Sequence, residues 1–189
     1  MTTVFVSPGP LAARDVVRVA RHHAPVELTD EALAEIARSR SFVDEQARGT
    51  GSHYGVTTGF GAMATRSIAV GDRARLQKHL LRSHAAGTGD VVEDEVVRAM
   101  MVLRLSTMAT GRTGVRPSTA TAYADLLNSH LVPVVHEYGS LGCSGDLAPL
   151  AHCALALIGE GVVHDRGVVR PTADALRDAG LRPVVLAEK

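Results

Sequence analysis

The segment from residue 91 to residue 110 constrains the fold most, because it carries apolar side chains on two sides of one predicted helix. At helical spacing one side presents Val92, Val96, Met100 and Leu103, and another presents Val97, Met101, Leu105 and Met108. A helix at a protein surface needs only one apolar stripe, so this helix is expected to be buried in the middle of a bundle. The sequence therefore predicts a mainly α fold.

Apolar residues at helical spacing predict further helices around this one. They are expected over residues 10–23, 30–48, 72–86, 117–131, 147–158 and 172–180. Thr29 is a suitable N-cap for the second of these helices. Residues 132–138 are expected to be extended, and residues 162–170 to form a small hairpin turning at Asp165–Gly167. No repeat or linker divides the sequence, which predicts a single domain over residues 1–189.

The composition excludes several classes of protein. Apolar residues make up 46% of the 189 residues, which is enough for a folded core. The 20 basic and 20 acidic residues cancel, and aromatic residues are 3%, which argues against a nucleic-acid or anionic-membrane surface. Neither a transmembrane run nor a signal peptide is evident. Two cysteines argue against a disulfide framework and fit a reducing cytoplasm, and the histidines lack metal-ligand spacing.

Two glycine-rich segments are the candidates for function. Residues 49–71 are rich in Gly, Thr and Ser and predict a long loop, which in a compact domain is often functional. The second segment, "YGSLGCSGDLAPLAH", covers residues 138–152. There Gly145 leaves the backbone free to turn, and Asp146 can cap a helix that begins at Leu147. The loop thus lies in the positive field of a helix N-terminus, which suits an anion or an electrophile that gains negative charge.

Two interpretations of this second loop carry little weight. A phosphate-binding loop needs G-x-G-x-x-G or G-K-[ST], whereas the spacing here is G-x-x-G-x-x-G. A thiol nucleophile at Cys143 would need a base, and His152 or His136 would have to reach it. Buried, inert cysteine is the commoner state.

A third interpretation comes from a family resemblance. "GSLGCSGDLAPLAH" resembles the signature of the histidine and aromatic amino-acid ammonia-lyases. "YGVTTGFG", which begins at Tyr54, and "LQKHLLRSHAAG", residues 76–87, resemble two other motifs of that family in the same order. The resemblance covers essentially the whole chain. It implies the N-terminal domain of the helical fumarase/aspartase-like fold, with a small hairpin and irregular loops.

The resemblance also implies a chemistry for the glycine-flanked loop. In the family, Cys143, Ser144 and Gly145 would cyclise to a methylidene-imidazolone (MIO) group, an electrophile for the substrate amine. Ser144 would lose its hydroxyl, and Asp146 resembles the aspartate that assists ring formation. Tyr54 matches the tyrosine that removes the β-proton. Ionising a tyrosine of pKa near 10 at pH 7 costs about 4 kcal/mol, which the site must offset. No metal or nucleotide is implied.

The same resemblance suggests a substrate. Ser83 and His84 match the pair that distinguishes substrates, and Ser-His resembles the histidine lyases. The implied reaction is L-histidine to trans-urocanate and ammonia, in histidine catabolism; tyrosine or phenylalanine is the alternative. His79 departs from the small polar residue usual in the family, which puts the packing near the pocket in doubt.

The resemblance further implies that more polypeptide completes the site. Family members continue beyond the residue matching Lys189 into a central helical bundle and assemble as homotetramers. A chain truncated before that bundle is expected to be part of a lyase that forms oligomers, or that a second chain completes. The alternative is an inactive fragment or a partner-dependent subunit of a split lyase.

Overall fold

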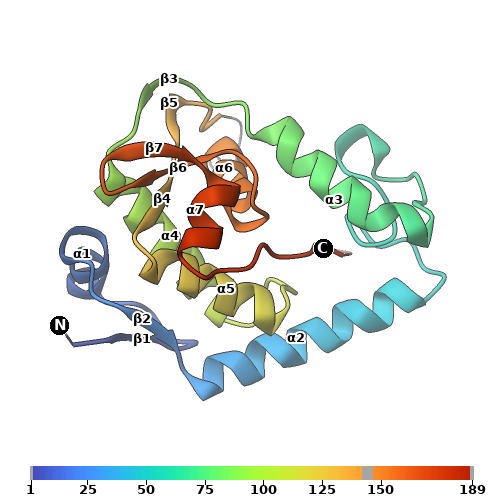
Figure 1. Ribbon diagram of the computed structural model, residues 1–189. Helices are drawn as coiled ribbons and strands as arrows, with labels where there is room; N and C mark the ends of the chain where they lie inside the picture. The colour runs from blue at the N-terminus through green and yellow to red at the C-terminus, as the bar shows by residue number, and fades with distance from the viewer. Residues whose placement is uncertain (1, 142–146, 188–189) are drawn as a thin grey trace.

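The computed structural model describes residues 2–141 and 147–187, and this part of the chain is mainly helical, as predicted (Figure 1). Its α-helices are α1 (Ala13–His22), α2 (Asp30–Arg48), α3 (Val70–His84), α4 (Asp94–Ala109), α5 (Pro117–Asn128), α6 (Leu147–Leu157) and α7 (Thr172–Asp178). Its strands are β1 (Val4–Val6), β2 (Val26–Leu28), β3 (Thr88–Val91), β4 (Leu131–Pro133), β5 (His136–Tyr138), β6 (Val162–Asp165) and β7 (Val168–Pro171), and η1 (Gly61–Met63) is a short 3-10 helix.

Helix α4 lies at the centre of the core, with one apolar side fully buried and the other buried only in part. It packs against α1, α2 and α5, and Val97, Met101 and Leu105 are almost fully buried there. On the other side Val96 and Leu103 are 49% and 51% exposed. The predicted central position is confirmed, whereas the prediction that both sides are buried is wrong for Val96 and Leu103.

A buried arginine completes the core around α4. Arg98 is 2% exposed, and its guanidinium donates to the carbonyl oxygens of Val19 at 2.9 Å and Leu127 at 2.9 Å. Both carbonyls belong to the last turns of their helices, α1 and α5, where the backbone has no intrahelical donor left. The positive side chain also lies at the negative ends of both helix dipoles. Arg98 therefore joins the C-terminal ends of α1 and α5 to α4.

The strands β1 and β2 form a parallel pair that the sequence did not predict. Val4 is paired with Val26, and α1 makes the crossover between the two strands. On the other edge of β2, the side-chain amide of Asn128 both donates to the carbonyl of Val26 and accepts from its N–H, each at 2.9 Å. Asn128 thus takes the place of a third strand.

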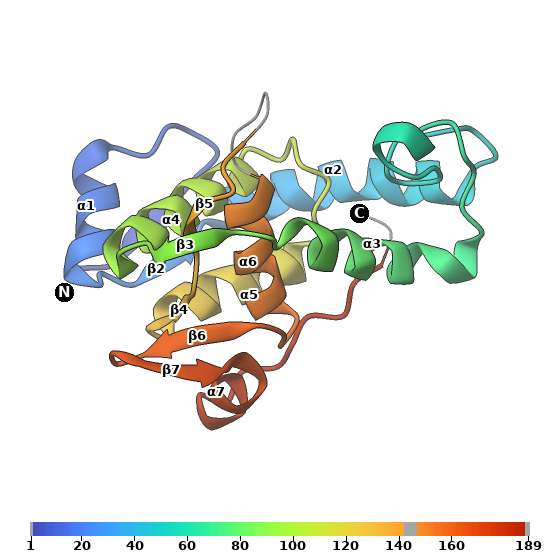
Figure 2. The ribbon, with the colours of Figure 1, turned by 90° about the horizontal axis from the view of Figure 1, so that it is seen from above.

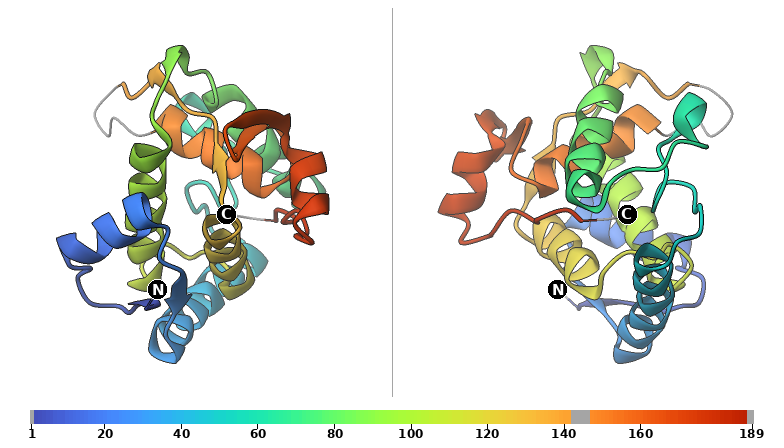
Figure 3. Two further views of the ribbon diagram at one scale, coloured as in Figure 1. Left: turned by 60° about the vertical axis from the view of Figure 1, so that its left-hand side comes forward. Right: turned by 90° about the vertical axis from the view of Figure 1, so that its right-hand side faces the viewer.

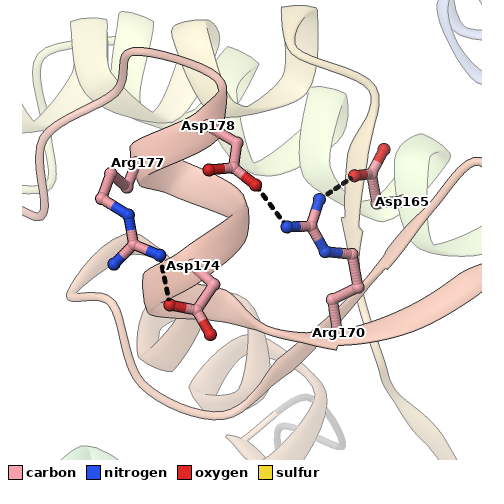
Figure 4. Close-up of polar contacts among 5 residues, drawn as sticks. All are labelled: Asp165, Arg170, Asp174, Arg177 and Asp178. Carbon is pink, nitrogen blue, oxygen red and sulfur yellow. Dashed lines mark hydrogen bonds and ion pairs between the residues drawn. The ribbon is translucent and has the colours of Figure 1, made fainter.

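The predicted hairpin is confirmed as β6–β7, turning at Arg166 and Gly167, which have φ angles of +51° and +82°. Together with α7 it lies at one edge of the molecule, next to β4 (Figures 2 and 3). Ion pairs fasten the hairpin to α7: Arg170 bridges Asp165 and Asp178 (Figure 4).

Most predicted helix boundaries agree with the structure within a few residues. Thr29 caps α2 as predicted, and its hydroxyl oxygen accepts from the amide of Ala32 at 3.2 Å. The largest differences are of three residues: α1 begins at Ala13, α4 begins at Asp94 after β3, and α5 ends at Asn128 before β4 starts. None of the helices in the described ranges has both the length and the apolar composition that a membrane span requires.

Candidate functional site

The predicted long loop between α2 and α3 is folded on its own backbone. The carbonyl oxygen of His53 accepts from the amides of Val56, Thr57 and Thr58 at 3.0 to 3.2 Å. The Thr57 hydroxyl accepts from the amide of His53 and donates to the carbonyl of Gly51, both at 2.8 Å. Because Thr57 and Thr58 are buried, their side chains hold the loop in one conformation.

Tyr54 is presented at the surface of this loop. Its side chain is 61% exposed, its ring meets the edge of Phe60 with 5.6 Å between centroids, and its hydroxyl accepts from the amide of Gly61 at 3.2 Å. Gly55 has a φ angle of +70°, and a Cβ there would lie 2.5 Å from the Phe60 ring. Glycine is therefore required beside Tyr54. Because Tyr54 is this exposed, its ring does not pack half-buried against the core.

Helix α3 connects the Tyr54 loop with the predicted substrate-selecting pair. The side-chain amide of Gln77 donates to the carbonyl of Gly55 at 3.1 Å. His84 stands seven residues further along α3, two turns away on the same face, about 10 Å along the helix axis. Gln77 was not predicted from the sequence, although it lies seven residues before His84, a spacing that places both on one face of a helix.

The side chains of Ser83 and His84 fold back on the last turn of α3. The Ser83 hydroxyl donates to the carbonyl of Leu80 at 2.9 Å, and His84 Nδ1 lies 2.9 Å from the same oxygen. Nδ1 also lies 3.0 Å from the Ser83 hydroxyl. In the tautomer with the proton on Nδ1, His84 donates to the Leu80 carbonyl and Nε2 is the acceptor nitrogen. Among the described residues, no hydrogen bond joins Tyr54 to either side chain.

Helix α6, which follows the glycine-rich loop, packs against α3 and the residues after it. From the middle of α6, His152 Nε2 accepts from the amide of Gly87 at 3.2 Å. The neighbouring His136, on β5, donates through Nδ1 to the carbonyl of Gly89 at 2.9 Å. Burial, followed by the proximity of His136, lowers the pKa of His152 below its usual value of 6.5.

Three residues beyond the C-terminal end of α6, Glu160 binds two cations of α3. Arg82 donates to both of its oxygens, at 2.7 and 2.8 Å, and Lys78 lies at 2.7 Å. Hydrogen bonds from Arg82 and Lys78 lower the pKa of Glu160 to about 2. Two sets of polar contacts therefore fasten α6 and the segment after it to α3 and the segment that follows α3: the His152–Gly87 hydrogen bond and the Glu160 ion-pair network.

Glu160→Gln is expected to lower the free energy of unfolding by about 1 kcal/mol at pH 7, since networked ion pairs at a surface contribute this order of energy. The folded-state pKa lies below the ordinary value of 4.5, so the contribution is present above pH 4.5 and is lost as the pH falls towards 2. Urea denaturation from pH 7 to pH 3 measures it, with Glu137→Gln, at an exposed position, as the control. If the loss of unfolding free energy in Glu160→Gln were the same at low pH and at high salt as at pH 7, the ion-pair network would not be its cause.

Other residues named in the sequence analysis, and the second cysteine, lie elsewhere. Cys143, Ser144, Gly145 and Asp146 lie outside the described residues, so the MIO, phosphate-loop and Cys143-thiol interpretations stay predictions. The neighbouring Cys153 is buried, and burial raises its pKa to about 12, so it is a packing residue. His79 is exposed on α3, away from the core.

Other features of the described chain lie away from this site. No group of three or more His, Cys, Asp or Glu side chains in residues 2–141 and 147–187 could hold a metal ion. One surface cavity of about 380 Å³ is lined by residues that include Phe42 and Arg112, and another of about 440 Å³ by Leu131 and Arg170. Neither cavity includes Tyr54, Ser83 or His84.

Comparison with known proteins points to one family. The family model "Aromatic amino acid lyase" matches residues 11–189. A histidine ammonia-lyase of Streptomyces coelicolor is 56% identical over the whole chain, which spans 37% of that protein.

Solved structures agree with the sequence match. A tyrosine aminomutase from Streptomyces globisporus has a TM-score of 0.92 at 36% identity, over 100% of this chain and 35% of its own. A histidine ammonia-lyase from Trypanosoma cruzi has a TM-score of 0.89 at 30% identity, over 98% of this chain and 36% of its own. The described fold is thus the N-terminal third of these structures, and the chain spans about 37% of the length of the curated relatives that it matches.

Proposed function

This chain belongs to the aromatic amino acid lyase family, and from that premise we propose that it is, as a single domain, the part of a histidine ammonia-lyase that carries the electrophile and selects the substrate. The family consists of carbon–nitrogen lyases that act on amino acids and use an MIO group. Cys143, Ser144 and Gly145 are the residues proposed to form that group here. The proposed reaction converts L-histidine to trans-urocanate and ammonia.

The observation that carries the proposal is the meeting of three separate sequence motifs at α3. Helix α3 itself bears Ser83 and His84, and Gln77 binds the loop that presents Tyr54. Helix α6, which begins at Leu147 directly after the proposed MIO segment, packs against α3. The described flanks of that segment fit such a group, since the first-turn amides of α6 have no intrahelical acceptors and carry positive potential.

The site residues that the structure describes each have a defined part in the proposed reaction. The MIO group, when present, supplies the electrophile for the substrate amine. Tyr54 removes the β-proton, the electron pair left on the β-carbon forms the double bond, and the C–N bond breaks to release ammonia. The amide of Gly61 holds the hydroxyl oxygen of Tyr54 in place. His84 has an acceptor nitrogen at Nε2, which suits contact with the N–H of a substrate imidazole.

Polypeptide beyond these 189 residues is proposed to complete the site, because the curated relatives are more than twice as long. That polypeptide would come from the same chain, from further subunits of a homo-oligomer such as a tetramer, or from a second chain. A cytoplasmic location is part of the same proposal. The alternative is a subunit that is inert by itself.

The test is an assay of the full gene product, beside the 189-residue chain alone, with L-histidine, L-tyrosine and L-phenylalanine. Urocanate is expected from histidine and is followed by its ultraviolet absorbance. Intact mass is expected to show the loss of two waters that ring formation requires. Turnover of tyrosine or phenylalanine alone would refute the substrate, and an unmodified mass would refute the electrophile. Activity only in the longer product would show that the 189 residues need the rest.

A further inference from the structure

His152 and His136 come from different elements and hold the same short piece of backbone. The amide of Gly87 donates to His152 Nε2 at 3.2 Å, and the carbonyl of Gly89 accepts from His136 Nδ1 at 2.9 Å. The two rings stand 6.0 Å apart between centroids, at an angle of 64°. This backbone begins three residues after His84, so the two histidines hold the chain close to the end of α3.

The backbone at Gly87 and the neighbouring Gly139 leaves no room for side chains at these two positions. A Cβ on Gly87 would lie 3.1 Å from His152 Nε2. Gly139, with a φ angle of +147°, would place a Cβ 2.9 Å from the Cβ of Ala148 and 3.1 Å from the Cα of Gly87. Ala148 is the second residue of α6. Because closely packed backbone does not deform gradually, a shift at Gly87 moves the first turn of α6 as well.

The contact requires a neutral imidazole. Nε2 can accept from the Gly87 amide only while it is unprotonated. The titratable group that faces His152 from β5 is His136, and the segment after α3 presents the backbone of Gly87. On α6 itself the neighbouring Cys153 stays neutral, since burial raises its pKa to about 12. Burial and His136 lower the pKa of His152, which keeps the acceptor available at neutral pH.

We propose that His152 is a positioning residue: its neutral imidazole fixes the backbone after Ser83 and His84 to α6, and so sets the substrate-selecting pair relative to the first turn of α6. The inference rests on the proposed function, because that function makes the relative position of these two segments matter. It concerns geometry only, and His152 itself is not proposed to touch the substrate.

The test compares His152→Leu, which removes the acceptor, with His152→Gln, whose amide oxygen can replace Nε2, in the full gene product. Leucine is expected to lower kcat/KM for histidine by about ten- to a hundredfold while the MIO mass change is kept, since small displacements in a site cost this much. Glutamine is expected to keep most of the activity. His22→Leu, at an exposed position on α1, is the matched control.

The pH dependence separates positioning from a purely structural role. Because the folded-state pKa of His152 lies below 6.5, its contribution is present above that value and is lost as the pH falls through the folded pKa. The wild-type protein should therefore lose activity, and hydrogen-exchange protection of the Gly87 amide, on the acid side. The glutamine variant should keep the Gly87 protection there, and its activity should fall less than that of the wild type, because the substrate itself still takes up protons in this range.

Two results would overturn the proposal: a leucine variant that equals the wild type, or a glutamine variant whose Gly87 amide loses its protection in acid as the wild type's does. If the leucine variant fails to fold, the Gly87 protection of the glutamine variant decides alone. Hydrogen exchange needs no turnover, so the two proposals can fail separately. A wild-type protein that makes no urocanate, but whose Gly87 protection responds to acid and to the glutamine variant as expected, would refute the function and leave the contact standing.

Discussion

Replacing Ser144 by alanine in the full gene product is expected to lower the rate of urocanate formation by about a thousandfold or more, as removal of a covalent catalytic group generally does. Alanine has no side-chain hydroxyl to lose, so the exocyclic double bond of the electrophile cannot form. The variant should fold as the wild type does, because the change removes a single atom. The rate is measured by urocanate absorbance, and the intact mass should show that the waters are retained.

Ser140→Ala is the matched control for this experiment. Ser140 is an exposed serine four residues earlier in the same glycine-rich segment, and its loss should change neither the mass maturation nor the rate appreciably. Wild-type turnover by the Ser144 variant would remove the basis of the whole proposed reaction.

Arg98→Met is expected to lower the free energy of unfolding by about 3 kcal/mol, because it leaves the carbonyls of Val19 and Leu127 buried without their donors. Methionine keeps much of the apolar volume of the arginine stem, so the loss reports mainly on the hydrogen bonds. Urea denaturation followed by circular dichroism measures the change.

Arg104→Met is the control for that prediction, since Arg104 lies on the same helix and is only half-buried. It should cost well below 1 kcal/mol, as most substitutions outside the core do. Equal losses at Arg98 and Arg104 would mean that capping of α1 and α5 contributes little.

The sequence predicted the helices well because their signals are local. The cap at Thr29 and the turn at Arg166–Gly167 depend on a few neighbouring residues, and both were found where expected. The surroundings of α4 were predicted less well. The apolar pattern predicted that Val96 and Leu103 are buried, yet both are about half exposed, whereas the charged Arg98 is buried. The carbonyls that demand an arginine there belong to helices far away in the sequence, so no pattern within residues 91–110 could reveal them.

The same distinction applies to the site. The motifs around Tyr54 and His84 could be found from the sequence, but not the contacts that join them. The hydrogen bond from Gln77 to Gly55 spans 22 residues, and that from Gly87 to His152 spans 65. The first pair depends on how the loop after α2 packs on α3, and the second on how α6 packs beside α3; spacing within one element encodes neither. The roles of Tyr54, Ser83, His84 and residues 143–146 remain predictions that the experiments above address.

The side chain of Asn128 has a consequence for association between molecules. A short parallel pair such as β1–β2 would otherwise leave the N–H and C=O of Val26 facing outward, as a template on which a foreign strand could add. Because the Asn128 amide already binds both groups, the N–H and C=O of Val26 are not free to hydrogen-bond with another strand. One polar side chain at the end of α5 thus removes Val26 as a place where another strand could pair.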